Sequence, residues 1–538
     1  MPFITQRCQT CGKLAESVKE CEIGKKKILI LKCGHIIASE GLDKGSPESI
    51  VSLDGKKLYP FQCDGARFIE SSGGRALIAD EMGLGKTVQS LSAISLHSEL
   101  TPFLAIVKSS LTQQWAHETM RWCGEDFFTQ IIEDSKTPLL PGLKGYIISY
   151  DLIRRYNDRR TREKASGQES PKSNRLREMM DKAGIKTVVI DEVQQIKNPE
   201  SQRTVEVREL CRGIPHVIAL SGTPIKNNAS EYFPILNILH PEMYPRYSHF
   251  VFNEVDSYYT GYGYKSGGLK FPERFKEKTK HFIIRRERKE VMPELPLVSR
   301  QFRFCDLKSE VEEAYKSTFK LFRNEMEGNG KPQFERESNI LAYLSKMRHL
   351  TGISKIDPTV DFVMEFLGGT DRKLTIFAHH KDVAEILKRK LEKLCDEIGE
   401  LKPLSLTSDL DPHDRSSLVD LFMNGSQRIL IASTLASGEG LNLQKCSDCI
   451  MMERQWNPAN EEQAEGRFAR IDQKNNKITA TYFVAVGTVD EFFSEIVERK
   501  REIVTKTLGG EAVKWDQSSL IKELSEILAS QGGKRWGI

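Results

Sequence analysis

Residues 80–87, DEMGLGKT, constrain the fold of this 538-residue chain more than any other segment. They follow the apolar run at residues 75–79, so they predict a strand that ends in a glycine-rich loop at the start of a helix. Such a loop aims backbone N–H groups at phosphate oxygens. Lys86 would reach the β- and γ-phosphates, and the Thr87 hydroxyl would hold Mg²⁺. Asp80 stands where the general pattern has its first glycine, so the prediction needs support from the rest of the chain.

A second apolar run supplies two acids. Residues 187–194, TVVIDEVQ, predict a buried strand with Asp191 and Glu192 at its carboxyl end, where open α/β sheets bind ligands. We expect Asp191 to help hold Mg²⁺ and Glu192 to orient and deprotonate the attacking water. Alone, the segment would fit a strand that ends in a solvated acidic turn. Together with Lys86, it predicts nucleotide hydrolysis.

Composition bounds the class of protein. With 39% apolar and 29% charged residues, the chain is expected to fold into three or four globular units. We expect neither a signal peptide nor a membrane-spanning apolar stretch, and the eleven cysteines are expected to be reduced thiols. We therefore expect a cytoplasmic protein in a bacterial or viral setting, or a nuclear one in a eukaryote, and not a secreted one. A net charge of +4 permits a groove for a polyanion without demanding one.

Strand-like runs alternate with helical patterns and predict an α/β protein with two lobes. We expect a cysteine-bearing head at residues 1–45, a first lobe at 55–240, helical insertions and a connector at 241–355, a second lobe at 360–505 and a tail at 506–538. The predicted strands of the first lobe are residues 76–79, 103–107, 146–149, 188–190 and 217–220. Those of the second are residues 374–378, 403–406, 429–433, 449–452 and 479–486.

Two other segments are predicted to be loops. Residues 258–270, YYTGYGYKSGGLK, are rich in glycine, tyrosine and lysine. Residues 154–182 are rich in Arg and Lys, and we expect a solvated loop there. The alternative is that this basic segment touches DNA phosphates, in which case neutralising its charges would flatten the salt dependence of DNA binding.

The order of the motifs resembles the Swi/Snf-type ATPases of helicase superfamily two. The first lobe carries LYPFQCDGARF, DEMGLGKT, FLAIVKSSLTQQWAHE, IDEVQQIKN and LSGTPIKN, and the second carries KLTIFAHHKDVAEIL, ILIASTLASGEGLNLQ and QWNPANEEQAEGRFARIDQ. The resemblance covers residues 55–505 and is greatest to the annealing-helicase branch. It implies two RecA-like lobes with parallel sheets that close on ATP and Mg²⁺.

The resemblance also implies roles for residues around the nucleotide. The amide of Gln62 suits the edge of an adenine, because it donates and accepts at once. The family shares the DEMGLGKT form, so the cofactor contacts are expected from Asp80, Gly83, Gly85, Lys86 and Thr87, with Gly438 and Gln463 from the second lobe. Arg467 and Arg470, three residues apart on one predicted helix face, would act as arginine fingers.

DNA contacts follow from the same resemblance. They are expected from Lys108, Ser109, Ser110, Ser221, Gly222, Thr223, Ser433 and Thr434. Contacts to phosphates carry no base information, so the protein would track DNA without reading its sequence. Trp115 and Trp122 are expected to pack in the core rather than stack on bases.

The N-terminal head carries a possible metal site. Cys8, Cys11, Cys33 and His35 predict a zinc-ribbon-like head that holds tetrahedral Zn²⁺, although Cys21 could replace one ligand. Cys446 and Cys449 lack a partner cluster and are expected to be packed core residues.

We therefore predict an ATP-dependent translocase that acts as a monomer on duplex or branched DNA in fork remodelling, annealing or branch migration. One alternative is a helicase that separates strands of DNA or RNA. The other is a zinc-bearing DNA-binding protein with an inactive nucleotide site. Protein partners cannot be deduced from the motifs.

Overall fold

The computed structural model describes residues 46–125, 127–135, 137–154, 175–222, 229–259, 264–293, 296, 298–327, 333–406, 410, 412–433, 443–455, 458–468, 473, 475, 477–507 and 517–531, together with five short strands before residue 46. The chain forms two compact units, Met1–Val291 and Met292–Ile538. Each unit is described by itself below.

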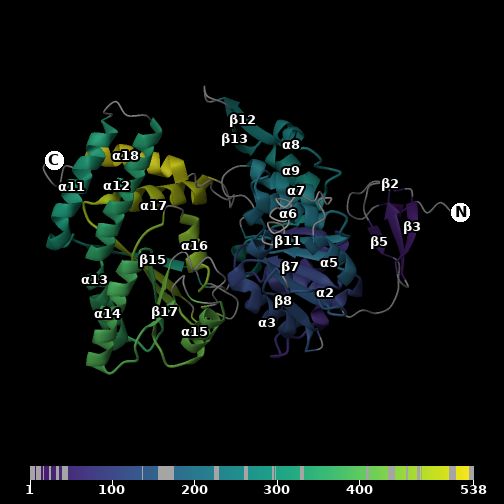
Figure 1. Cartoon of the computed structure of the whole chain (residues 1–538), viewed down its shortest axis with the longest axis horizontal. Coiled ribbons are helices and arrows are strands. Elements are labelled where there is room, and N and C mark those ends of the chain that lie inside the picture. The colour runs from purple at the N-terminus through teal and green to yellow at the C-terminus, as the bar shows by residue number, and fades with distance from the viewer. Residues whose placement is uncertain are drawn as a thin grey trace, which may run out of the picture. The chain divides into compact units, whose positions relative to one another are not determined.

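A seven-stranded sheet in which every neighbouring pair is parallel forms the centre of the first unit (Figure 1). Its spatial order is β14 (Ile283–Ile284), β6 (Arg75–Ile78), β11 (His216–Leu220), β10 (Thr187–Ile190), β7 (Phe103–Val107), β9 (Gly145–Ser149) and β8 (Thr129–Ile132). The five strands predicted for this lobe are all present.

Helices cover both faces of this sheet, which is why its central strands are mostly apolar. Side chains alternate between the faces, so Leu77 packs into one core cluster and its neighbours Ala76 and Ile78 pack into the other. One face is covered by α5 (Arg175–Ala183), α6 (Gln202–Cys211) and α7 (Tyr232–Leu239). The other is covered by α1 (Pro60–Ser71), α2 (Lys86–Leu96) and α3 (Thr112–Cys123).

Both predicted loops contain regular structure. In place of the glycine- and tyrosine-rich loop the chain forms an antiparallel hairpin, β12 (Val255–Tyr259) and β13 (Tyr264–Leu269), because each strand supplies the other with backbone partners that composition does not reveal. Helix α5 occupies the end of the basic segment, where Leu176 and Met180 are spaced four residues apart and both are fully buried. The prediction of loops was wrong for these two strands and for α5, whereas residues 155–174 and 260–263 lie outside the described residues.

The remaining elements of the first unit are short. They are α8 (Tyr247–Glu254), α9 (Pro272–Thr279), α10 (Arg288–Val291) and the 3₁₀ turns η1 (Pro47–Ser49), η2 (Ser98–Leu100), η3 (Ser109–Leu111), η4 (Val193–Ile196) and η5 (Ala229–Glu231). At the N-terminus, β1 (Gln6–Arg7) pairs with β2 (Leu14–Ala15), and β3 (Ser17–Ile23), β4 (Lys26–Leu31) and β5 (Ile36–Ala38) form an antiparallel sheet.

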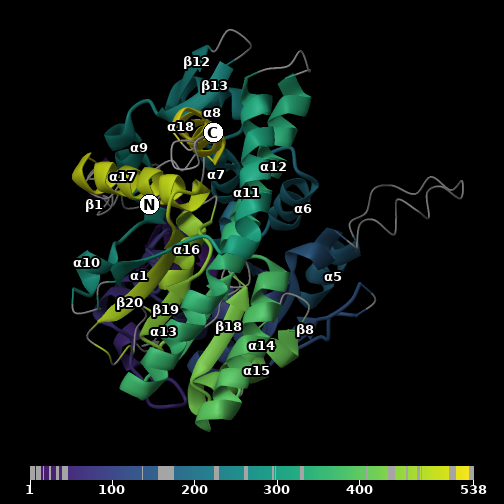
Figure 2. The same ribbon diagram turned by 90° about the vertical axis from the view of Figure 1, so that its left-hand side faces the viewer.

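The second unit contains a six-stranded sheet, again parallel throughout (Figure 2). Its order is β15 (Val298–Cys305), β20 (Ile478–Ala485), β19 (Asp448–Met451), β16 (Leu374–Ala378), β18 (Ile429–Ser433) and β17 (Leu404–Leu406). The five predicted strands are present. The predicted helical character of residues 300–355 was wrong for β15, because this edge strand carries partly exposed polar side chains and lacks an apolar run.

Helices again cover both faces of this sheet. They are α13 (Ile356–Gly369) and α14 (Lys381–Ile398) on one face, and α15 (Pro412–Asn424) and α16 (Pro458–Glu465) on the other. A separate apolar cluster joins α11 (Ser309–Met326), α12 (Gln333–Ser354), α17 (Val489–Thr507) and α18 (Gln517–Gln531). The predicted RecA-like lobes with parallel sheets are thus confirmed.

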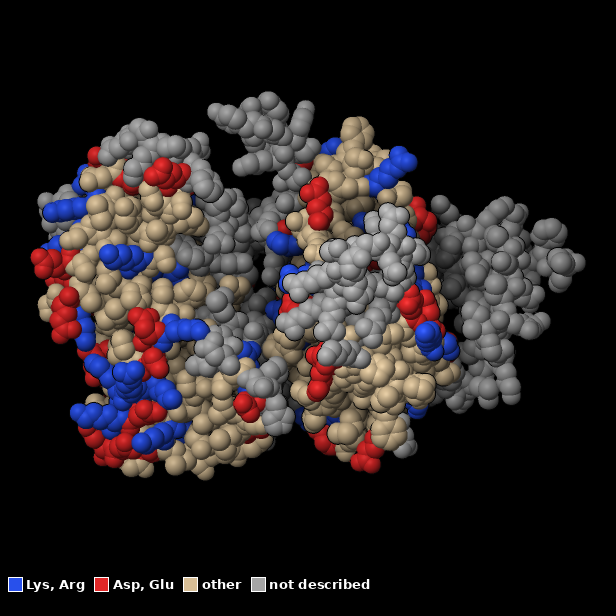
Figure 3. Space-filling view, viewed as in Figure 1, with Lys and Arg blue, Asp and Glu red and all other residues tan. Residues whose placement is uncertain are grey.

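The surface mixes charges of both signs. On α14, Lys388 pairs with Glu392 and Lys393 with Glu397, and Figure 3 shows blue and red side chains intermingled on this part of the second unit. Exposed pairs of this kind contribute little stability. None of the helices in the described ranges is long and apolar enough to cross a membrane.

Candidate nucleotide site

The loop between β6 and α2 has the shape that a phosphate group requires. Gly83 and Gly85 have φ of +89° and +71°, a left-handed conformation that glycine adopts without steric cost. Gly85 is also the N-cap of α2, and an added Cβ would lie 2.5 Å from the amide nitrogen of Gln62. Lys86 lies at the first position of α2, and its Nζ donates to the backbone carbonyls of Asp80 and Glu81 at 2.9 and 3.3 Å. The helix N-terminus and the lysine ammonium therefore converge on one loop.

Gln62 braces this loop from α1. Its buried amide donates from Nε2 to the Leu84 carbonyl at 3.3 Å and accepts the Tyr59 N–H at 3.1 Å. An amide keeps a second N–H and a second lone pair after these bonds, so contact with an adenine stays a prediction.

The side chain of Asp80 holds the start of the loop. It is fully buried, and Oδ1 accepts from the backbone N–H and Nε of Arg286 at 3.1 and 3.0 Å. Oδ2 accepts from Nη2 of Arg286 at 2.5 Å and from Gln89 at 3.0 Å. These partners occupy the carboxylate, and contact of Asp80 with a cofactor stays a prediction. Arg286 lies 206 residues further along the chain, so the motif alone could not show this anchor.

The two predicted acids lie at the same edge of the sheet as the phosphate loop. The parallel strands β6, β11 and β10 are consecutive neighbours, so their carboxyl ends meet there. Asp191 follows β10 and accepts from Trp115 Nε1 at 2.8 Å and from the Glu192 N–H at 2.9 Å. Burial and the charge of Glu192 raise the pKa of Asp191 to about 6, while the Trp115 hydrogen bond and the charge of Lys86 oppose this shift.

This environment fits Mg²⁺. The repulsion between two carboxylates at this partly buried turn would be relieved by a divalent cation, and Mg²⁺ in such sites takes only one or two protein carboxylates besides the phosphates. Thr87, the second residue of α2, is partly buried. Asp191 and Thr87 thus remain the predicted magnesium ligands.

Glu192 is held in a strained conformation. Its φ of +50° is left-handed, which costs a non-glycine residue about 1–3 kcal/mol and is typical of functional sites. Its carboxylate accepts a hydrogen bond from the Gln194 amide, whose oxygen accepts the Ser221 hydroxyl at 2.6 Å. A chain of hydrogen bonds therefore joins Glu192 to the segment after β11.

Ser221 and Gly222 were predicted to contact DNA, and the structure places them at the phosphate loop instead. Ser221 is fully buried, and an added Cβ at Gly222 would lie 2.5 Å from Met82 Cγ and 3.4 Å from Lys86 Nζ. The reason is topological, because β11 lies between β6 and β10 and its end points into the nucleotide site. Thr223 lies outside the described residues.

The other predicted DNA contacts of this unit follow β7. Lys108 precedes η3, Ser109 is exposed and Ser110 is partly exposed. Since β7 lies between β10 and β9, these residues begin at the same edge of the sheet as the acids.

The second unit carries fewer of its predicted residues in the described ranges. Ser433 ends β18, whereas Thr434, Gly438 and Arg470 lie outside the described residues, as does the side chain of Gln463 in α16. Arg467 is mostly buried and lies in a turn after α16, which ends at Glu465. That Arg467 and Arg470 share one helix face stays a prediction, because Arg470 lies outside the described residues.

The zinc prediction is not tested by the structure. Cys8, Cys11, Cys33 and His35 lie outside the described residues, and the described part of the chain holds no group of three or more His, Cys, Asp or Glu side chains placed to bind a metal ion. Cys446 and Cys449 are buried as predicted.

Trp115 is the functional residue that sequence reasoning missed. It is buried, as expected, but its ring N–H also holds Asp191. A buried indole N–H requires an acceptor, so this need was the available signal. Gln194, Arg286 and Tyr150, whose hydroxyl donates to the Asp191 carbonyl at 2.6 Å, carried no comparable signal.

Comparison with known proteins identifies the family. Residues 61–352 match the model of the SNF2-related domain, more than half of the chain, and residues 355–472 match the helicase conserved C-terminal domain. The chain belongs to the SNF2-related family. The resemblance inferred from the motifs is thereby confirmed.

Two relatives of this SNF2-related chain illustrate its place in the family. The SWI/SNF-related matrix-associated actin-dependent regulator of chromatin subfamily A-like protein 1 of Xenopus tropicalis is 27% identical over 84% of the chain and 45% of that protein. The human DNA annealing helicase and endonuclease ZRANB3 is 25% identical over 88% of the chain and 42% of that protein. The chain thus spans less than half the length of these two relatives. A Sulfolobus solfataricus SWI2/SNF2 ATPase core solved in complex with dsDNA is 24% identical over 91% of the chain and 96% of that structure, with a TM-score of 0.40.

Proposed function

We propose that this SNF2-related chain hydrolyses ATP in response to duplex DNA and moves along the duplex to remodel forks, anneal strands or migrate branches. The observation that carries the proposal is the meeting of Lys86, Asp191 and Glu192 at one edge of one sheet, close enough for the charge of Lys86 to lower the pKa of Asp191. The description of one relative as a DNA annealing helicase supports the choice of task.

Each part of the site has a place in hydrolysis. The phosphates of ATP would lie against the backbone of Gly83 and Gly85, with Lys86 on the β- and γ-phosphates. Mg²⁺, held by Thr87 and Asp191, supplies charge neutralisation when it is bound. Glu192, oriented by Gln194, would position the attacking water and take its proton.

Two further groups of predicted residues would take part. Arg467 and Arg470 would stabilise the charge that spreads over the transferring phosphoryl group. Lys108, Ser109, Ser110, Thr223, Ser433 and Thr434 would hold DNA phosphates, so the protein would track a strand without reading bases. Hydrolysis would then depend on closure of the two units of a monomer.

Titration of the ATPase rate of the full chain with duplex, forked and single-stranded DNA and with RNA tests the proposal. We expect duplex or forked DNA to stimulate hydrolysis most, and Lys86→Ala to abolish it. Equal stimulation by single strands would favour a strand-separating helicase instead. Full activity of Lys86→Ala would refute the assignment of the site.

A further inference from the structure

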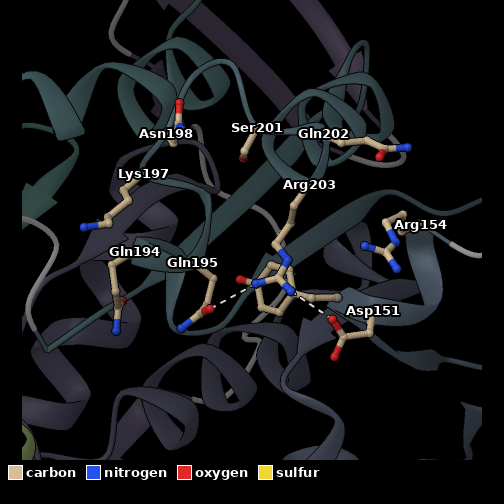
Figure 4. A pocket seen from close by; sticks show the side chains of 10 residues that line it. Asp151, Arg154, Gln194, Gln195, Lys197, Asn198, Ser201, Gln202 and Arg203 are labelled. Atoms are coloured by element: carbon tan, nitrogen blue, oxygen red, sulfur yellow. Dashed lines mark hydrogen bonds and ion pairs between the residues drawn. The ribbon is translucent and has the colours of Figure 1, made fainter. Parts of the chain in front are cut away.

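A polar cavity of about 460 Å³ lies in the first unit beside the turn that carries Asp191 and Glu192. Three segments line it: the residues that follow β9, the η4 turn with the residues after it, and the first turn of α6 (Figure 4). The cavity is within the size range of ligand sites, about 300–1,000 Å³. All of its lining residues belong to the first unit.

The lining favours an anion. It contains three cationic side chains, Arg154, Lys197 and Arg203, and one carboxylate, Asp151. In Figure 4, Arg203 reaches between Gln195 and Asp151, with which it forms bonds of 3.1 and 2.8 Å. Lys197 pairs with Glu231 at 2.8 Å. The three cations of the lining thus meet two carboxylates, Asp151 and Glu231, and a phosphate would add acceptors for the forked donors of arginine.

A nucleobase is a poor occupant. The one aromatic ring in the lining is Tyr150, and the Arg203 guanidinium lies 5.6 Å from the centre of that ring. The ring face is therefore already covered, and the rest of the lining consists of charged residues, amides and a serine. Small-molecule pockets are mostly apolar, whereas nucleic-acid phosphates are bound by such charged and amide groups.

The same lining residues hold the catalytic turn. The Tyr150 hydroxyl donates to the Asp191 carbonyl at 2.6 Å, and Gln194 hydrogen-bonds both Glu192 and Ser221. A ligand that orders Arg203 would thus order Tyr150 beneath it, and through Tyr150 the backbone of Asp191. The end of β7 lies at the same edge of the sheet as the cavity, because β7 lies between the strands β9 and β10 that lead into the lining.

We infer that this cavity binds a backbone phosphate of DNA and transmits its presence to Asp191 and Glu192 through Tyr150 and Gln194. The inference rests on the proposed function, because it explains how DNA would stimulate hydrolysis. Arg203 is the phosphate ligand, Lys197 and Asn198 belong to the same lining, and Tyr150 is a positioning residue that touches neither substrate.

Charge reversal within the cavity tests the phosphate site. Asn198 Oδ1 accepts the Glu200 N–H at 3.0 Å, and Asn198→Asp preserves this acceptor while it adds a negative charge. We expect Asn198→Asp and Arg203→Gln to raise the duplex concentration for half-maximal ATPase stimulation about tenfold. Binding of a labelled duplex should also lose about one unit of its log–log salt slope in Arg203→Gln.

Arg212→Gln is the matched control, since Arg212 follows the other end of α6 and its side chain is 77% exposed. Variants of the cavity that titrate like Arg212→Gln would overturn the inference. If Arg203→Gln fails to fold, as judged by circular dichroism, Asn198→Asp decides the question by itself.

Tyr150→Phe separates coupling from binding. The variant keeps the ring beneath Arg203 and loses only the hydroxyl that holds Asp191. We expect the affinity for duplex to stay within twofold of the wild-type value and the DNA-stimulated kcat to fall at least about fivefold. A lower kcat with unchanged affinity is expected when an interaction is made only in the active geometry. An unchanged stimulated kcat would overturn the coupling. If the wild-type chain binds duplex but gains no ATPase activity, the proposed function is overturned as well. This outcome differs from failure of the cavity inference alone, in which the wild-type chain is still stimulated by duplex.

Discussion

Removing the indole N–H of Trp115 should change the pH dependence of ATP hydrolysis. This group donates to Asp191 Oδ2 at 2.8 Å, and the bond is one of the interactions that oppose the raised pKa of that buried carboxyl. Trp115→Phe removes the donor and keeps an aromatic ring in the core. Since only the deprotonated carboxylate holds Mg²⁺, the effect should appear as a demand for higher pH or more Mg²⁺.

The magnitude follows from the hydrogen bond. A bond to a charged group contributes about 1.5–3 kcal/mol, and one pKa unit corresponds to about 1.4 kcal/mol, so its loss should raise the pKa of Asp191 by about 1–2 units. From its starting value of about 6, the carboxyl would become mostly protonated near neutral pH. At pH 7 the Mg²⁺ concentration for half-maximal hydrolysis should rise about two- to tenfold. Above pH 9 the variant and the wild type should converge.

The assay is the DNA-stimulated ATPase rate measured over pH and Mg²⁺ concentration. Trp122→Phe is the control, because Trp122 lies on the same helix, is also buried and donates to Glu118 at 3.0 Å. The reasoning is refuted if the acidic limb of the plot of rate against pH is the same in Trp115→Phe as in the wild type. It is also refuted if this limb shifts equally in Trp122→Phe.

Three further substitutions test other parts of the structure. Arg286→Ala leaves the fully buried Asp80 without its cation and should destabilise the first unit by about 3–5 kcal/mol, seen as a lower urea midpoint. Gly85→Ala combines a left-handed φ of +71° with a side-chain amide 2.5 Å from the new Cβ, so the KM for ATP should rise at least about tenfold. Burial alone would raise the pKa of Glu453. Hydrogen bonds from His380 outweigh burial and hold this pKa at about 2. The ionised carboxylate therefore stabilises the fold fully at pH values above 4.5, the pKa of an ordinary glutamate. Glu453→Gln should lower the thermal midpoint at pH 7, and the difference from the wild type should shrink as the pH falls from 4.5 towards 2.

Each of these substitutions has a control in the same chain. Arg288→Ala breaks a more exposed pair with Glu81 and should cost less stability than Arg286→Ala. Gly184 has a φ of +69°, and an added Cβ would have no atom within 4 Å. Gly184→Ala therefore adds the backbone strain without a steric clash. Glu385→Gln removes an exposed acid on α14 and should give the same thermal midpoint as the wild type at each pH.

Much of the fold could be deduced from local sequence. Strands such as β7 and β16 are mostly apolar and buried along their whole length, because helices cover both faces of each sheet, and their bounds agree with the predicted ones. The edge strands β8 and β15 escaped prediction, because one side of an edge strand meets solvent and its side chains need not be apolar, whereas the edge strand β17 was predicted.

The sequence by itself determined the phosphate loop, the two acids at the end of β10 and the family to which they belong, since each depends on residues that are neighbours in the chain. The tertiary structure decided which side chains the loop and the acids contact. Arg286 reaches Asp80 across 206 positions and Trp115 reaches Asp191 across 76. Ser221 enters the nucleotide site because β11 lies between the two strands that carry it. Hydrogen bonds and ion pairs require their partners to be placed to within a few tenths of an ångström. Strand order sets this placement for residues that no local pattern connects.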